Sequence, residues 1–86
     1  MLLKDIKPNR ERIRDVFCKV LKVPESTYQK DLGVDEIPAW DSIGHLNLLQ
    51  AIEKEFNIAF DIDDAIDIET IDDVEQNVEK YLEGNQ

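Results

Sequence analysis

Apolar residues recur every three or four positions along most of the chain, and this spacing places them on one face of an α-helix. The first such stripe is formed by Ile13, Val16, Phe17 and Val20. Asn9 is a favourable N-cap for this helix, and Pro24 is expected to end it because the residue before a proline avoids helical backbone angles. The pattern therefore predicts an amphipathic helix that begins near Asn9.

A second helix and a short third one are predicted from the next apolar positions. The second stripe consists of Leu46, Leu49, Ile52 and Phe56, widened by Ile43 and Leu48. Asp41 and Ser42 are both strong N-cap residues for this helix. Asp61 is placed to cap a short third helix that is expected to bury Ile62 and Ile66.

The last helix is predicted from a weak capping box, in which Thr70 is the N-cap and Asp73 follows three residues later. Its apolar stripe is Ile71, Val74, Val78, Tyr81 and Leu82. Gly84 is expected just past the helix end, where glycine is favoured. Three longer helices and one short helix predict an all-α fold class, a small four-helix bundle with a long loop after its first helix.

Residues 24–41 form that long loop, which contains two prolines, one glycine and no sustained period. Loops of this length are uncommon in compact domains and are usually functional or anchored. Four apolar residues are expected to attach the loop to the core, namely Leu32, Val34, Ile37 and Trp40. The apolar runs at 58–60 and 66–68 are too short to change the class, and a length of 86 residues predicts one domain, 1–86.

Charge restricts the partners of the chain. Twenty acids and ten bases give a net charge of −10, and residues 41–86 alone, with thirteen acids and two bases, carry −11. Such a field repels phosphates and anionic lipids, so we expect no nucleic-acid partner and no membrane insertion. It favours partners with basic surfaces, although the acidity could also serve only to keep a small monomer soluble.

Cysteine content and the N-terminal residues point to a compartment. Cys18 is the only cysteine, so an internal disulfide and a cysteine-based metal site are excluded, and a reducing, cytoplasmic location is expected. Cys18 itself is expected to be a small packed side chain. Met1–Asp5 shows no apolar run of the kind that forms a signal peptide.

Catalytic constellations are scarce. His45, the only histidine, lies three residues after Ser42, but no third group that would orient a Ser–His pair is evident, and a small bundle offers no obvious oxyanion hole. The acidic run that begins at Asp61 fails as a calcium loop at three required positions, which are occupied by Ala65, Ile66 and Asp72. No catalytic residues and no metal site are therefore expected.

The segment from Trp40 to Leu46 places a serine at a helix start, directly after the long loop. Ser42 is expected to expose its hydroxyl there, close to free backbone N–H groups and the positive end of the helix dipole, which is a favourable setting for an attached phosphate. The alternative is that Asp41 or Ser42 only caps the helix, because such caps are common.

Several short motifs, in this order, resemble the acyl carrier protein family. Asp41-Ser42-Ile43 resembles the family's Asp-Ser-Leu attachment motif, and Asp31-Leu32-Gly33 resembles its Asp-Leu-Gly in the preceding loop. The segments Ala51–Ile58 and Thr70–Val74 resemble the end of the family's second helix and the opening of its last helix. The resemblance covers about residues 9–83, and the ordered set is far more specific than the serine motif alone.

The resemblance implies that Ser42 receives 4′-phosphopantetheine from coenzyme A through a separate Mg²⁺-dependent phosphopantetheinyl transferase. Asp41 would then help that transferase to dock, besides capping the helix. The thiol at the end of the arm would hold an acyl group as a thioester and present it to acyl-loading and acyl-processing enzymes at high effective concentration. A protein of this kind is a carrier and not an enzyme.

The chain departs from typical fatty-acid-synthase carriers in two respects. Gly44, His45 and Asn47 stand where those carriers have acids, and the loop before the serine is longer. These features look more like a specialised lipid or polyketide-like pathway; an aminoacyl or peptidyl carrier and an unmodified interaction module with the carrier fold are the alternatives. The residues expected to contact partners are Ile43, His45, Asn47, Glu53, Asp63, Asp64 and Asp67.

Overall fold

The computed structural model describes residues 7–84, which form four α-helices. These are α1 (Asn9–Leu21), α2 (Ser42–Phe56), α3 (Ile62–Asp67) and α4 (Ile71–Gly84), with one 3₁₀ turn, η2 (Glu25–Thr27), after α1. No strand forms in this part of the chain, so the predicted all-α bundle with three longer helices, one short helix and a long first loop is confirmed. The segment Met1–Asp5, in which no signal peptide is predicted, lies outside the described residues.

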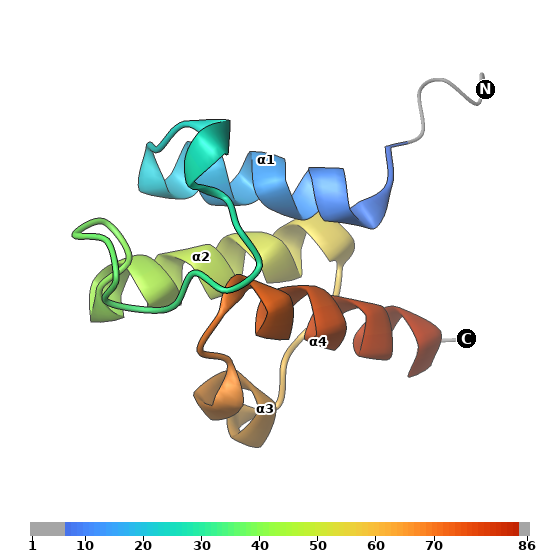
Figure 1. The fold of residues 1–86 in the computed structure, drawn as a ribbon. Helices are drawn as coiled ribbons and strands as arrows, with labels where there is room; N and C mark the ends of the chain where they lie inside the picture. The colour runs from blue at the N-terminus through green and yellow to red at the C-terminus, as the bar shows by residue number, and fades with distance from the viewer. Residues whose placement is uncertain (1–6, 85–86) are drawn as a thin grey trace.

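Figure 1 shows how the helices are arranged. α1 and α2 pack against each other and run in opposite directions, while α4 runs in the same general direction as α2. The short α3 lies at the periphery of the bundle. The loop between α1 and α2 passes over one side of the bundle. Within residues 7–84, no helix combines the length and the apolar character that a bilayer span requires.

The buried core draws on the three longer helices and on the segments that connect them. It comprises Ile13, Phe17, Leu21, Trp40, Leu48, Leu49, Ile52, Phe56, Ile58, Ile68, Ile71, Val74 and Val78. The stripes predicted for α1 and α4 are confirmed, and the loop is attached as expected, with Trp40 fully buried and three neighbours packed against the core, Leu32, Val34 and Ile37. The prediction for α2 is wrong at Leu46 and Ile43, which are 57% and 72% exposed because they lie on its first two turns, where no helix covers them.

Three predicted helix boundaries are wrong in detail. Asn9 is the first residue of α1 rather than its cap, and Pro8 occupies the N-cap position without a side-chain hydrogen bond. α1 ends ahead of Pro24 because Lys22 adopts the left-handed conformation, with φ 58°. Gly84 is helical and does not stand past the end of α4.

The capping box predicted at the start of α4 is confirmed. The Asp73 N–H donates to Thr70 Oγ1 at 3.2 Å, and the Thr70 N–H donates to Asp73 Oδ2 at 3.1 Å. The same Oδ2 also accepts the N–H of Glu69 at 2.9 Å. These bonds satisfy N–H groups that the start of a helix leaves unpaired, and they fix the junction between α3 and α4.

α3 is attached by polar contacts to α4 and not, as predicted, by burial of Ile62 and Ile66, which are 77% and 71% exposed. The Tyr81 hydroxyl accepts the backbone N–H of Asp61 at 2.7 Å and donates to the Asp64 carboxylate at 2.6 Å. Asp61 stands at the N-cap as predicted, but its side chain makes no capping bond. Because the attachment is polar, the two isoleucines are not needed in the core and remain exposed.

Backbone hydrogen bonds hold the loop between α1 and α2 at two places. The Val34 N–H donates to the carbonyl of Glu69 at 2.9 Å, which ties the loop to the α3–α4 junction. Near its end the loop folds back on itself, since the Asp35 N–H donates to the carbonyl of Trp40 at 2.7 Å. The chain that enters α2 is therefore held by backbone bonds as well as by the buried indole of Trp40.

Gly44 allows the closest approach between the loop and α2. It lies in the first turn of α2 against the carbonyl oxygen of Ala39. A Cβ atom added at Gly44 would overlap with this oxygen. A side chain at this position would push on backbone, which cannot rotate away as a flexible side chain can.

We predict that Gly44→Ala lowers the free energy of unfolding by about 1–3 kcal/mol, the usual range for overpacking, although alanine favours helices over glycine by about 1 kcal/mol. Urea unfolding followed by circular dichroism measures the change. The matched control is Gly84→Ala, because nothing lies within 4 Å of a Cβ atom added at Gly84. If Gly44→Ala is as stable as the wild type, the close approach to Ala39 is not a real constraint.

Candidate functional site

Ser42 is the first residue of α2, and its side chain is exposed. Asp41 precedes it in an extended conformation and is the N-cap, with its Oδ1 accepting the Gly44 N–H at 2.8 Å. The predicted helix start is thus confirmed. Because the carboxylate of Asp41 makes the cap, the hydroxyl of Ser42 is not needed for it.

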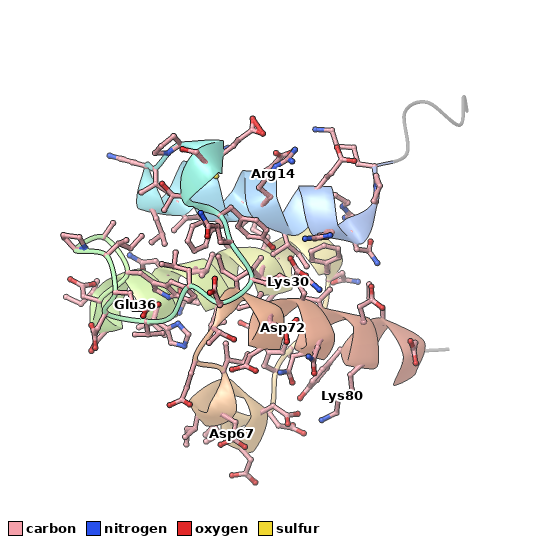
Figure 2. The ribbon with its side chains drawn as sticks, in the orientation of Figure 1. Arg14, Lys30, Glu36, Asp67, Asp72 and Lys80 are labelled. Atoms are coloured by element: carbon pink, nitrogen blue, oxygen red, sulfur yellow. The ribbon has the colours of Figure 1, made fainter. Side chains whose placement is uncertain are left out.

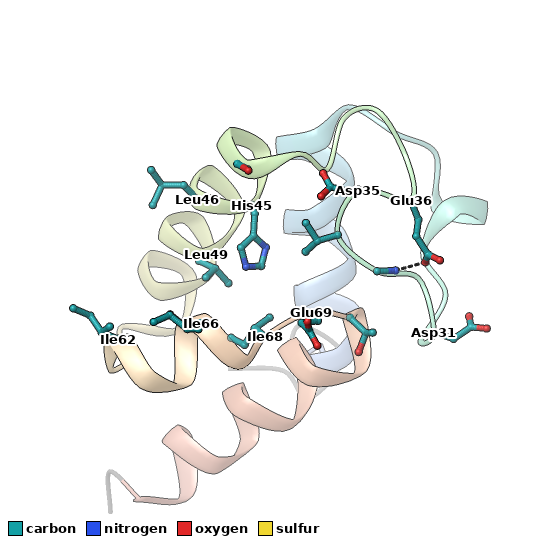
Figure 3. A pocket seen from close by; sticks show the side chains of 15 residues that line it. Asp31, Asp35, Glu36, His45, Leu46, Leu49, Ile62, Ile66, Ile68 and Glu69 are labelled. Carbon is teal, nitrogen blue, oxygen red and sulfur yellow. Dashed lines mark hydrogen bonds between the residues drawn. The ribbon is translucent and has the colours of Figure 1, made fainter.

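An open groove of about 810 Å³ extends from Ser42 between α2, α3 and the loop (Figure 3). Its apolar wall consists of Val34, Leu46, Leu49, Ile62, Ile66 and Ile68. Four acidic residues also line the groove, namely Asp31, Asp35, Glu36 and Glu69. The groove therefore combines an apolar surface with negative charge.

Four large exposed apolar side chains lie along and beside this groove, and we call them the apolar rim: Ile43, Leu46, Ile62 and Ile66. Exposed apolar surface that is concentrated in one region of a small protein often marks a ligand groove or an interaction site. The sequence pattern predicts these residues as core because a stripe at helical spacing has the same appearance whether it faces a core or a groove.

His45 lies half-buried in the wall of the groove. Its Nδ1 accepts a hydrogen bond from the indole Nε1–H of Trp40 at 3.0 Å, so the neutral ring carries its proton on Nε2. Trp40 in turn packs edge to face against Phe17 of α1, with ring centroids 5.2 Å apart. The start of α2 is therefore joined to the core through this histidine.

Neither a hydrolytic pair nor a metal centre is supported by the geometry. The Nδ1 of His45 is bonded to an indole, so no carboxylate orients the imidazole toward Ser42 as a hydrolytic triad requires. Within residues 7–84, no three side chains of His, Cys, Asp or Glu are grouped so that they could hold a metal ion.

The acids predicted to contact partners fall into two kinds. Asp63 and Asp67 are exposed on α3, and Figure 2 shows Asp67 at its outer edge. Asp64 is paired with Lys80, with 3.1 Å between Oδ1 and Nζ, and Glu53 accepts a backbone N–H from the segment before α3 at 2.8 Å. Asp64 and Glu53 therefore already stabilise the position of α3, whereas Asp63 and Asp67 present their charges to solvent.

Two contacts of the site are missed by sequence reasoning. One is the bond between Trp40 and His45, and the other is the Glu36 carboxylate, which accepts the N–H of Gly33 at 2.5 Å and stabilises a turn at the edge of the groove. Both depend on a loop without periodicity, so no repeating pattern marks them. A tryptophan five residues before the only histidine is the sole signal that could have indicated the first contact.

Burial lowers the pKa of His45 below the ordinary histidine value of about 6.5. The unfolded chain therefore binds a proton at this residue more readily than the folded chain, so we predict that the free energy of unfolding falls as the pH drops through and below that value. His45→Asn keeps an acceptor for the indole but has no imidazole that titrates. Both proteins contain the same carboxylates, so the titration of these groups affects both alike. Between about pH 7.5 and about pH 5.5, the wild type should lose more stability than the variant in urea unfolding; equal losses would contradict the prediction.

Comparison with known proteins places the chain in a family. Residues 11–78, which include Ser42 and all the residues that line the groove, match the family model described as the phosphopantetheine attachment site. An acyl carrier protein of Karelsulcia muelleri (strain GWSS) is 36% identical over 64 residues, which cover 74% of this chain and 70% of that protein. The chain therefore belongs to the acyl carrier protein family, whose members carry acyl groups on 4′-phosphopantetheine and are not enzymes.

Proposed function

We propose that Ser42 is the residue to which the 4′-phosphopantetheine arm is attached. The supporting observation is the position of its hydroxyl, which is exposed on the first residue of α2 and lines the groove. A phosphate bonded to this oxygen would lie at the positive end of the α2 dipole, which favours an anion. When attached, the arm supplies a terminal thiol that holds an acyl group as a thioester.

The groove fits such an arm and an apolar cargo. Leu46, Ile62 and Ile66 give an acyl chain a surface that is removed from water on contact, which stabilises contact by about 25 cal/mol per Å² of apolar area. Because the groove is open along its length, a partner enzyme can reach the thioester without unfolding the bundle. The polar attachment of α3 through Tyr81 keeps these side chains in place without burying them in the core.

We assign Asp41 a second role, the docking of the phosphopantetheinyl transferase. It is exposed and adjacent to Ser42, so a transferase that reaches the hydroxyl also reaches this carboxylate. The neutral residues that follow, His45 and Asn47, are proposed to make partner-specific contacts together with the exposed Ile43.

We propose a specialised lipid or polyketide-like pathway for this carrier. The support is the neutral start of α2, where Gly44, His45 and Asn47 replace the acids expected of a typical fatty-acid-synthase carrier. Gly44 is required by the approach of the loop, so this departure is built into the fold. Aminoacyl or peptidyl cargo is the second candidate, since the same site would carry it by the same chemistry.

Partners with basic surfaces are proposed to meet α3 first. Asp63 and Asp67 are exposed there, next to the apolar rim, and net charge of one sign steers association more than it tightens a complex. Glu53 and Asp64 belong to the same acidic region, but they also hold backbone and side-chain groups within the chain.

A monomeric, single-domain protein acting in the cytoplasm is proposed on further observations. Cys18 is a free thiol that packs against the core, and burial raises its pKa, which makes the reactive thiolate scarcer. A packed, unreactive cysteine suits a reducing compartment. The helices of residues 7–84 share one core cluster, which fits a single domain.

We predict that incubation with coenzyme A, Mg²⁺ and a broad-specificity phosphopantetheinyl transferase adds one phosphopantetheine to the wild type and none to Ser42→Ala. Ser26→Ala is the matched control, because Ser26 is the only other serine, and it should be modified like the wild type. Intact-mass spectrometry measures the adduct, and circular dichroism checks that each variant is folded. An adduct on folded Ser42→Ala, or none on the wild type with several transferases, contradicts the proposal.

We predict that Asp63→Asn combined with Asp67→Asn slows association with a cognate enzyme by about two- to fivefold at low salt and flattens the salt dependence of the rate. The matched control is Glu79→Gln with Glu83→Gln, which removes the same charge from exposed positions on α4. Stopped-flow measurements between about 0.02 and 0.5 M salt give the rates. If the two double variants have equal rates and equal salt slopes, α3 does not steer partners.

A further inference from the structure

His45 turns its second ring nitrogen away from the core. Because Nδ1 accepts the indole N–H of Trp40 at 3.0 Å, the proton is on Nε2, and the two nitrogens lie on different edges of the ring. The side chain is half-buried and lines the same groove as Ser42. Figure 3 shows the ring extending from α2 into that groove. The orientation of this N–H donor is therefore set by a bond to a fully buried residue.

The spacing of Ser42 and His45 suits a group attached to the serine. They are three residues apart on α2, so they are neighbours on one helix face with Cβ atoms about 5–6 Å apart. The imidazole extends into the groove that Ser42 also lines, so a group attached to the serine and laid along the groove passes beside the ring. A phosphodiester on the serine hydroxyl would lie about one helical turn from the imidazole.

Hydrogen-bond donors for an anion are scarce in this groove. Among the residues that line it, His45 has the only side chain that contains nitrogen. The Gly44 N–H at the start of α2 is already taken by the carboxylate of Asp41. Four acidic residues also line the groove, namely Asp31, Asp35, Glu36 and Glu69. A phosphodiester on Ser42 would therefore enter a groove with several acidic residues along it, and a fixed N–H group would offset the repulsion.

We propose that His45 is a positioning residue for the arm, donating its Nε2–H to a phosphodiester oxygen on Ser42 while its Nδ1 remains bonded to the Trp40 indole. This inference rests on the proposed attachment at Ser42. The buried Trp40, His45 and the phosphodiester then form a chain of hydrogen bonds from the core to the base of the arm. This series of hydrogen bonds directs the arm along the groove.

Two substitutions separate the two bonds of His45. His45→Asn places an acceptor near the position of Nδ1 and has no donor that reaches the position of Nε2. His45→Gln places an amide donor near the position of Nε2 and loses the acceptor for the indole. Gln50→Ala is the matched control, since Gln50 is exposed on the same helix and does not line the groove.

The experiment compares the unmodified and the phosphopantetheine-carrying protein by NMR, after intact mass has confirmed the modification. Imidazole ¹⁵N spectra should show the Nε2–H tautomer in the unmodified protein. The pKa of His45 should be higher in the modified protein, because a neighbouring anion favours the charged ring. The ³¹P resonance of modified His45→Gln and Gln50→Ala should stay near that of the wild type, and that of His45→Asn should move toward the resonance of free phosphopantetheine.

The Trp40 indole N–H resonance should behave in the opposite way, unchanged in His45→Asn and shifted in His45→Gln. An Nδ1–H tautomer, an unchanged pKa of His45 on modification, or an unchanged ³¹P resonance in His45→Asn overturns the inference while leaving the attachment site intact. A wild-type protein that does not accept the arm is recognised earlier, by its mass, and overturns both the inference and the proposed function.

Discussion

The burial of Trp40 is the constraint on which the rest of the structure depends. Its indole is fully enclosed, packs edge to face against Phe17 of α1 and donates its N–H to His45 of α2, so one side chain joins two helices and the end of the loop. A buried N–H without a partner costs about 1–3 kcal/mol, and the imidazole removes this cost. Because Trp40 precedes Ser42 by only two residues, its position decides where the serine hydroxyl stands.

The short helix α3 is held by polar contacts rather than by a buried side chain such as Trp40, and this attachment forms one wall of the groove. Tyr81 and Lys80 of α4 bind Asp64 and the backbone of Asp61, and these contacts fix the short helix from its polar side. Ile62 and Ile66 of the apolar rim are consequently left exposed in the wall of the groove that Ser42 also lines. The start of α2 is held firmly, and one wall of the groove belongs to a short helix that is attached by polar contacts. This combination suits a carrier that must shelter its cargo and release it.

Much of this fold could be predicted from the sequence, because amphipathic stripes and helix caps are local properties. The capping box of Thr70 and Asp73 and the start of α2 at Ser42 are examples. Ile62 was predicted as core and faces the groove instead, since the contact that decides its environment joins Tyr81 to Asp64, seventeen residues apart. The candidate serine could be predicted from the order of the motifs, whereas the groove and the orientation of His45 depend on tertiary packing.

The most direct test of the claim that Ser42 carries the arm is the intact mass of the protein purified from the cells that make it, followed by mapping of the modified peptide. We predict a phosphopantetheine adduct on the peptide that contains Ser42, either alone or extended by an acyl group whose mass identifies the cargo. A protein that is unmodified under every growth condition, or an adduct on the peptide that contains Ser26 instead, would contradict the claim.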